Sequence, residues 1–531
     1  MNAKFDREKI LDNMRGEKIL HIGNIANNAY QNAKMLNKEG VDCDVLSYDY
    51  YHIMGCPEWD DADFNGEVDA NFPEWKKVDL QGFKRPRWFV AGPLWICRYY
   101  IIAKRKNNKL LANFYWYILT WVREEIAASK DHSKYTLLFI VKFILKIRSY
   151  LINAIRFVMA LVIGGINAIW KSVHKEENIK QYMPKSKIED DYVEDKLKRI
   201  RKDFKELFPD RECEFGDETR NLIRGAESFR KIVNEYDCVI AYATNPVWMY
   251  LIDFEQYIAY EHGTIRDMPY ENNEFARLML LAYAKAKAIY VTNVDCYDSA
   301  KYITQNIHTP VICGLHGIDI DSMIRRIDQA GEENIRKELG LESNEVVFFC
   351  PSRHSWDDKL QLFLKGQDKM LRAAGKVLKD FRNFKIILVN FGNDVDKIKK
   401  VIEDVEGLEE HILWIEPVKK EKLYKIYKSA DAVIDQFVLK GYGAITFEVL
   451  AAQSALISIN ANENYQIEFF GEKLPYFSCD NEDEIRNSMK EVIEKTNRYK
   501  SYISCSRTWI AEHHSNDKIV DALGEAISYC I

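Results

Sequence analysis

The chain has 531 residues, of which 47% are hydrophobic and 29% charged, so it is a folded protein too long for a single core. Its formal net charge of −6 is ordinary and by itself points to no partner class. The eleven cysteines are scattered without a Cys-x-x-Cys pair, which argues against a disulfide framework or a zinc site and favours a reducing compartment.

The first fifty residues predict a cytoplasmic protein that opens with a Rossmann-like unit. Residues 1–16 are charged and lack an apolar core, so no signal peptide is expected. A strand is predicted over Lys18–Gly23, then a helix that ends at Gly40, then a strand over Asp42–Leu46. The loop from Gly23 to Asn28 lacks Gly-x-Gly-x-x-Gly, so tight dinucleotide binding is not expected.

A basic, aromatic segment then interrupts the alternation of strands and helices until about Asn221. Residues 80–175 contain 17 Lys and Arg against 3 Asp and Glu, a local net charge of +14 that leaves −20 for the rest of the chain. Within the segment, Leu151–Trp170 is apolar except for Arg156. Aromatic and basic residues on apolar helices favour an anionic membrane interface, although a true membrane span or an internally packed insertion stays open. Binding of single-stranded nucleic acid fits less well, because the apolar runs are too continuous.

Alternation resumes in two series of predicted strands. The first series has strands beginning at Asp237, Phe254, Ala286 and Pro310. The second series has strands beginning at Glu345, Phe384, Ile412, Ala432 and Ala455. Two such series predict an α/β protein with two facing, doubly wound Rossmann-like domains. The expected boundaries are 1–315 with a helical insertion at about 80–192, then 316–505, then a terminal helix over 506–531 that packs back on the first domain.

Two features of the second series indicate a nucleotide diphosphate. Arg353 and Lys359 follow its first strand, and both can neutralise phosphate oxygens. The turn Gly441-Tyr442-Gly443 precedes a helix predicted over Ile445–Ala452, whose first turns contain Glu448. A helix start favours phosphate, whereas a carboxylate just inside it suits sugar or ribose hydroxyls.

These positions resemble the large retaining glycosyltransferase family with the GT-B fold, often called family four. The resemblance implies that Arg353 and Lys359 hold the donor diphosphate as catalytic groups, together with His262 at the donor sugar. It also implies that the ribose binds Glu448 and that the base binds near Pro417 and Val418. The remaining implied residues are the donor-binding turn Gly441, Tyr442, Gly443 and Ala444 and the acceptor-side residues Gly23, Asn27 and Asn28.

One position departs from the family. Its Glu-x7-Glu pattern would place a carboxylate at residue 440, which is Lys440 here. Asp435-Gln436 followed by Gly-Tyr-Gly resembles a branch of the family, so an altered sugar pocket is expected. Metal binding is not expected, because the Asp-x-Asp pairs at Asp61 and Asp319 have no further oxygen ligands nearby. His513 and His514 also lack a spaced third ligand.

The sequence thus predicts a metal-independent, hexosyltransferase-like enzyme without a cofactor, peripheral or monotopic on the inner face of the cell membrane. Its expected substrates are a nucleotide-diphosphate sugar and a lipid-linked glycan acceptor in surface polysaccharide assembly, and no nucleic acid. A sugar-nucleotide epimerase with the same fold is an alternative. A non-catalytic membrane partner protein is another, prompted by Lys440.

Overall fold

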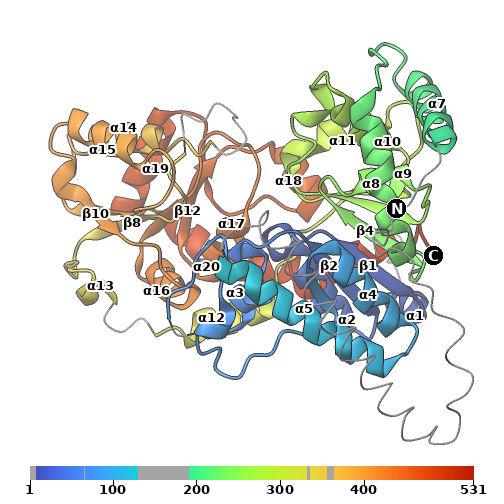
Figure 1. The fold of residues 1–531 in the computed structure, drawn as a ribbon. Coiled ribbons are helices and arrows are strands. Elements are labelled where there is room, and N and C mark those ends of the chain that lie inside the picture. The colour runs from blue at the N-terminus through green and yellow to red at the C-terminus, as the bar shows by residue number, and fades with distance from the viewer. Residues whose placement is uncertain (1–6, 65, 130–189, 332–334, 356–363) are drawn as a thin grey trace, which may run out of the picture. The chain divides into compact units, whose positions relative to one another are not determined.

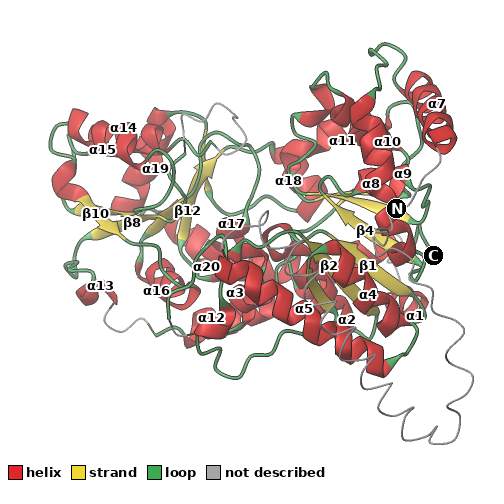
Figure 2. Cartoon of the chain, in the orientation of Figure 1, coloured by secondary structure: helices red, strands yellow, loops and turns green. Residues whose placement is uncertain are grey.

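A computed structural model describes residues 7–64, 66–129, 190–331, 335–355 and 364–531. Its strands form two parallel sheets of seven and six strands, each covered by helices (Figures 1 and 2). The chain divides into two compact units: Met1–Leu46 with Arg201–Gly216 and Val233–Ile531, and Ser47–Ile200 with Asp217–Ile232. The predicted α/β class with two parallel Rossmann-like sheets is confirmed.

The first sheet has the order β3-β2-β1-β4-β5-β6-β7. The pairs from β2 through β7 are parallel, and long apolar runs keep β4, β5 and β6 buried on both faces. Strand order reverses between β1 and β4, so the loops after these two strands meet at one point of the carboxyl edge. The strands are β1 (Lys18–Ile22), β2 (Asp42–Tyr48), β3 (Phe89–Gly92), β4 (Cys238–Tyr242), β5 (Tyr257–Glu261), β6 (Ala288–Val291) and β7 (Val311–Cys313).

The second sheet has the order β10-β9-β8-β11-β12-β13, again with parallel pairs. Its order reverses between β8 and β11, which brings the loops after those strands together. Helices α14, α15 and α19 cover one face and contribute a continuous apolar core (Figure 1). The strands are β8 (Val346–Cys350), β9 (Phe384–Val389), β10 (Ile412–Ile415), β11 (Ala432–Ile434), β12 (Ala455–Ile459) and β13 (Phe477–Cys479).

The helices of the first unit follow the strands in sequence. The last of them, α21, packs against α1 and α2 and against strands β6 and β7. Close packing there requires Gly524, because a Cβ at this position would lie 2.5 Å from Ile10 Cγ2. The helices are α1 (Arg7–Arg15), α2 (Asn28–Lys38), α9 (Pro246–Leu251), α10 (Glu274–Ala284), α11 (Tyr297–Thr304), α12 (Ile320–Gln329), α13 (Ile335–Glu338), α14 (Gln367–Val377), α15 (Val395–Asp404), α16 (Lys420–Ser429), α17 (Ala444–Ala451), α18 (Glu463–Phe470), α19 (Glu482–Ile493), α20 (Asn497–His513) and α21 (Asn516–Ile527).

The second unit is mainly helical, with α3 (Pro57–Asp61), α4 (Leu94–Arg105), α5 (Lys109–Ser129), α8 (Asp217–Val233) and most of α7 (Asp190–Leu207). Helices α4 and α5 pack on each other and on β3. No helix within the described ranges is long and apolar enough to cross a membrane. The predicted interfacial segment Leu151–Trp170 lies outside the described residues.

The prediction that strand–helix alternation stops before residue 80 is wrong at one place. Phe89–Gly92 forms β3, the edge strand of the first sheet, followed by α4. All four residues are buried, but the run is short and lies directly after Lys84, Arg85 and Arg87. Strong local charge therefore obscured a strand whose apolar signal is only four residues long.

Candidate functional site

The loop after β8 carries Arg353 and is fixed by neighbouring loops. Ser352 Oγ donates to Asp435 Oδ1 at 2.6 Å, across the point where strand order reverses. The Arg353 carbonyl accepts from Gln367 Nε2 at 2.9 Å, and His354 N donates to the Phe391 carbonyl at 2.8 Å. The backbone beside Arg353 is therefore anchored to β11, α14 and the loop after β9.

An open cavity of about 600 Å³ lies beside this loop. Gly392 permits the close approach of its two walls, because it has a φ of +125° and a Cβ there would lie 2.4 Å from the His354 carbonyl oxygen. Positive and neutral polar side chains share the lining with the Asp396 carboxylate and one exposed aromatic ring. The two cations, Arg353 and Lys399, outnumber the carboxylate, so the cavity can take an anionic ligand that also has a flat apolar part. Its lining residues are Arg353, Ser355, Asn390, Phe391, Gly392, Asn393, Val395, Asp396 and Lys399.

Lys359, the second predicted diphosphate residue, lies outside the described residues. The structure instead brings Lys365 to the reversal point, with its Nζ donating to Gln436 Oε1 at 2.5 Å. Burial and the nearby Arg353 lower the pKa of Lys365, while Asp435 acts in the opposite direction. Lys365 is followed by Gly366, which has a φ of +72° and caps the start of α14. That Lys-Gly pair before a helix is the sequence signal that prediction missed.

The Gly-Tyr-Gly turn is held from both ends. Gln436 Nε2 donates to the Gly441 carbonyl at 2.7 Å, so Gln436 joins the turn to Lys365. A Cβ at Gly441 would lie 2.8 Å from Asp295 Oδ1, which restricts this position to glycine. Tyr442 is buried with its hydroxyl 3.4 Å from that of Tyr476. These contacts fix the chain that enters α17.

Helix α17 presents its first backbone N–H groups without a side-chain cap. Gly443 occupies the cap position in an extended conformation, and no side chain there accepts a hydrogen bond. Uncapped N–H groups and the positive helix end attract a phosphate oxygen. Ala444 is the first residue of the helix, one position before the predicted start.

Glu448 lies in the second turn of α17 and is only 6% exposed. Tyr427 from α16 donates its hydroxyl hydrogen to Glu448 Oε2 at 3.2 Å, which orients the carboxylate. Lys440, by contrast, is well exposed, and its Nζ lies 3.8 Å from Asp480 Oδ1. The residue at the family's first carboxylate position therefore makes a loose surface ion pair.

His262 follows β5 and contacts the loop after β1. Its Nε2 lies 3.3 Å from Asn28 Nδ2, and its Nδ1 lies 3.5 Å from Thr292 Oγ1. Burial, with a smaller contribution from the Arg266 guanidinium, lowers the pKa of His262 to about 4. The imidazole is therefore neutral near pH 7, so one ring nitrogen can accept a hydrogen bond.

The loop after β1 is compact and ordered by its own asparagines. Asn24 Nδ2 donates to Asn27 Oδ1 at 2.9 Å, and Asn27 has a φ of +57°. Gly23 has a φ of +91°, and a Cβ there would lie 2.5 Å from Asn245 Nδ2. The structure thus joins Asn28 with His262 and places Gly23 and Asn27 in the same turn; their role toward an acceptor stays a prediction.

His316 lies between His262 and Phe447 of α17, and all three residues belong to the first unit. Its ring lies edge-on to that of His262, with centroids 5.6 Å apart, and 5.4 Å from the ring of Phe447. His514 also packs on Phe447, with ring centroids 4.0 Å apart. His316 is a further residue that prediction missed, since nothing in its flanking sequence marks it as part of a site.

Pro417 and Val418 follow β10 at the edge of the second sheet, as predicted. Pro417 is exposed and Val418 half-buried, and neither lines the cavity beside Arg353. Their predicted contact with a base stays a prediction.

Neither acidic pair gives evidence for a metal site. Asp319 caps α12 by accepting from Ser322 N at 3.1 Å, and its other oxygen lies 3.0 Å from Lys34 Nζ. Among the described residues, no group of three His, Cys, Asp or Glu side chains is placed to hold a metal ion. His513 is occupied locally, with its Nδ1 2.7 Å from the Phe470 carbonyl oxygen.

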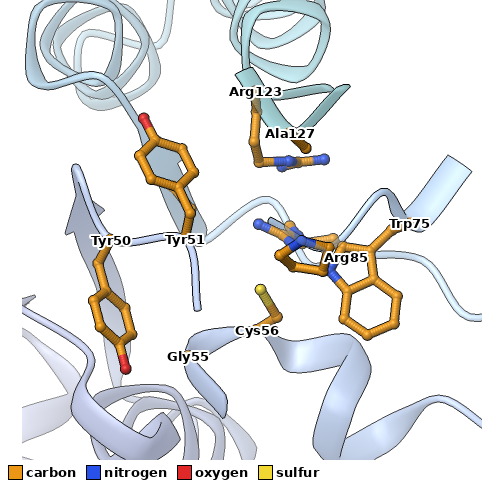
Figure 3. A pocket seen from close by; sticks show the side chains of 10 residues that line it. Tyr50, Tyr51, Gly55, Cys56, Trp75, Arg85, Arg123 and Ala127 are labelled. Atoms are coloured by element: carbon orange, nitrogen blue, oxygen red, sulfur yellow. The ribbon is translucent and has the colours of Figure 1, made fainter. Parts of the chain in front are cut away.

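A smaller cavity in the second unit, about 20 Å³, contains buried charge (Figure 3). Arg85 donates to both oxygens of Glu58 at 2.9 and 2.7 Å, and Arg123 and Cys56 line the same space. Burial alone would raise the pKa of Glu58, but Arg85 outweighs it and holds that pKa below its usual range. With room for about one water molecule, this cavity is an internal ion-pair network rather than a substrate pocket.

Comparisons with known proteins concern the second sheet and its loops. Residues 332–509, about a third of the chain, match the model of the family described as "Glycosyl transferases group 1". This part of the chain is therefore similar to that family. An uncharacterized glycosyltransferase of Methanocaldococcus jannaschii is 24% identical over 124 residues, which cover 23% of this chain and 30% of that protein. The chain thus spans less than a third of the curated relative that it matches.

Solved structures are similar at low identity. A glycosyltransferase from Rickettsia africae has a TM-score of 0.48 and 13% identity, over 97% of this chain and 98% of that one. The Anabaena protein HepE, solved in complex with UDP-glucose, has a TM-score of 0.44 and 17% identity, over 58% of this chain and 81% of that one. The matched residues 332–509 include Arg353, Lys365 and the Gly-Tyr-Gly turn in loops, and Glu448 in α17.

Several buried histidines make stability depend on pH. Burial lowers the pKa of His21 and His514 to about 3 and that of His354 and His262 to about 4, from an ordinary 6.5. Between pH 6.5 and 4 the unfolded chain therefore binds more protons than the native one. We therefore expect the free energy of unfolding to decrease as the pH is lowered from 6.5 to 4, by up to about 1.4 kcal/mol per pH unit for each histidine.

Urea unfolding at a series of pH values measures this dependence. H514Q should flatten the slope whatever it does to stability at pH 7, because it removes one titrating group. H308N, at an exposed position, is the matched control. An unchanged slope in H514Q would contradict the prediction.

Proposed function

We propose that the chain is a retaining, metal-independent glycosyltransferase that uses a nucleotide-diphosphate sugar. The observation that carries the proposal is the set of groups at the reversal point of the second sheet. There Arg353 and Lys365 supply positive charge, α17 supplies uncapped N–H groups, and Glu448 supplies a buried carboxylate. The positive groups suit the diphosphate of such a donor, and the negative carboxylate suits the hydroxyls of its ribose.

The chemical step transfers the sugar from the diphosphate to an acceptor hydroxyl. The bond between the anomeric carbon and the diphosphate oxygen breaks, and the electron pair stays on the leaving diphosphate. Arg353, Lys365 and the helix start stabilise that negative charge without a metal ion. A new bond forms between the anomeric carbon and the acceptor oxygen on the same face of the sugar, and the proton of the acceptor hydroxyl passes to the leaving diphosphate. Neutral His262 contacts the donor sugar through a ring nitrogen.

The acceptor in this proposal is a lipid-linked glycan at the inner face of the cell membrane, in surface polysaccharide assembly. The support is the composition of residues 80–175, in which basic and aromatic residues are interleaved and acidic residues are nearly absent. Lys440, exposed where the family has a carboxylate, leaves the donor sugar open.

Nucleotide release from a panel of sugar nucleotides, with and without membrane lipid extract, tests the proposal. Release that requires lipid and yields a labelled lipid-linked glycan supports it. Isomerised donor without transfer would identify an epimerase. If no nucleoside diphosphate binds, the chain is a non-catalytic partner protein. Lys440, at the position where the family has a carboxylate, prompts this alternative. Retention at the anomeric carbon is read from the product by NMR, and added chelator should leave the rate unchanged.

A further inference from the structure

One face of helix α5 in the second unit is apolar and exposed. Leu110, Phe114 and Tyr117 follow the helical spacing of four and three residues, and Leu110 and Tyr117 are 85% and 69% exposed. The opposite face, which includes Ala112, Leu119 and Ile126, is buried in the unit. Helix α5 therefore has two apolar faces, of which the protein core uses only one.

Neighbouring residues extend this exposed face, which we call the α5 face and define as Tyr99, Leu110, Leu111, Phe114 and Tyr117. Tyr99 from α4 stacks on Tyr115 of α5 with centroids 5.4 Å apart, so the two helices share the surface. Tyr99 and Leu111 are each more than two-fifths exposed. An exposed cluster of this size on a soluble surface marks an interaction site.

The sequence that carries the α5 face is basic. Helix α4 ends at Lys104-Arg105, and the turn to α5 contains Lys106 and Lys109 directly before Leu110. No Asp or Glu occurs in the sequence between Asp79 and Glu124. Arg98 also lies over the Tyr99 ring, 5.2 Å from its centroid. Apolar residues flanked by lysine and arginine complement a surface that is anionic outside and apolar beneath.

We propose that the α5 face docks on an anionic lipid bilayer, with Leu110, Phe114 and Tyr117 entering the interface and the basic turn among the headgroups. This inference rests on the proposed function and locates the contact that would bring the chain to a lipid-linked acceptor. A second copy of the chain fits less well, because a symmetric contact would bring like basic turns together. Nucleic acid fits less well too, because Leu110 and Leu111 offer no ring for stacking.

Sedimentation with vesicles of phosphatidylcholine containing about one third phosphatidylglycerol tests the proposal on the full chain. We expect the double variant L110S/Y117S to bind these vesicles at least about tenfold more weakly, since two exposed apolar side chains are lost from the interface. The matched control is I467S/Y529S, which removes an aliphatic and an aromatic residue exposed elsewhere. It should bind as the unaltered chain does.

Hydrogen exchange gives a local readout that does not depend on other membrane-binding segments. Peptides spanning residues 106–117 should become protected when anionic vesicles are added, and not with pure phosphatidylcholine. Equal binding of L110S/Y117S, absence of protection, or equal protection by neutral vesicles would each overturn the proposal. Protection that instead rises with protein concentration would show self-association.

A separate measurement distinguishes this inference from the proposed function. Nucleoside diphosphate affinity without vesicles should be the same in L110S/Y117S, because the α5 face lies in the other unit. If L110S/Y117S binds both the nucleoside diphosphate and the vesicles as the unaltered chain does, only the membrane-docking inference is overturned. If the unaltered chain does not bind a nucleoside diphosphate, the proposed glycosyltransferase function is overturned.

Discussion

Replacing Lys365 by alanine is expected to weaken binding of a nucleoside diphosphate by about thirtyfold to a hundredfold. The ammonium is half-buried beside Arg353 and Gln436, so its interaction with phosphate is poorly screened by water. Arginine at this position should restore part of the affinity, since it keeps the charge but has a different shape. Isothermal titration calorimetry of K365A and K365R with a nucleoside diphosphate measures both effects.

The control for Lys365 is a lysine inside α14, the helix that follows it. Lys376 makes surface ion pairs with Glu482 and Asp483, so K376A removes a charge from that helix away from the loop after β8. K376A should bind the ligand as the unaltered chain does. Equal affinity of K365A and the unaltered chain would exclude Lys365 from the diphosphate site. If K376A weakened binding as much as K365A, the effect would be one of overall charge.

Replacing Glu448 by glutamine is expected to weaken binding of a complete nucleotide donor by about tenfold to a hundredfold. The carboxylate accepts hydrogen bonds strongly because it is ionised, and the amide keeps its size but loses the charge. The free base, which lacks the ribose, should bind E448Q and the unaltered chain with the same affinity. Competition assays with the nucleoside diphosphate and with the base report the difference.

Tyr427 separates ribose binding by Glu448 from a purely structural role. Its hydroxyl is the donor to Glu448 Oε2 at 3.2 Å, so Y427F removes an internal hydrogen bond and leaves the carboxylate in place. We expect Y427F to lower stability by about 1 kcal/mol with a smaller effect on donor affinity. If Y427F and E448Q reduce affinity equally while E448Q also lowers stability, Glu448 acts by supporting α17. Unchanged donor affinity in E448Q would exclude the ribose assignment.

The fold was predictable where apolar runs were continuous. Strands beginning at Ala432 and Ile412 were predicted and are β11 and β10, because parallel strands read as continuously apolar runs. Strands β3 and β13 were missed because charged residues precede β3 and the middle residue of β13, Ser478, is polar, so neither gives a clear apolar signal. The terminal helix predicted over 506–531 is instead the end of α20 followed by α21.

Candidate site residues were predictable where they directly follow a strand. They were harder to predict where they reach the same edge of the sheet from elsewhere in the sequence. Arg353 and the Gly-Tyr-Gly turn follow β8 and β11, which the strand order places side by side. Lys365 was missed because sequence spacing does not reveal that the chain returns to the strand ends at this residue. His316 was missed for a different reason: its contacts with His262 and Phe447 join residues more than fifty positions apart. The roles of all these residues stay predictions.

The position of α21 has a consequence for synthesis on the ribosome. This helix, which follows both sheets in sequence, buries Ile519, Val520 and Leu523 and packs on α1 and α2 and on β6 and β7 of the first sheet. During synthesis, all seven strands of the first sheet are therefore present before α21, which covers part of that sheet, has been translated. The second sheet needs only residues 346–479 for its strands and can be completed earlier. The order of folding should thus run against the order of translation, and the first sheet is the part most exposed to chaperones and to aggregation.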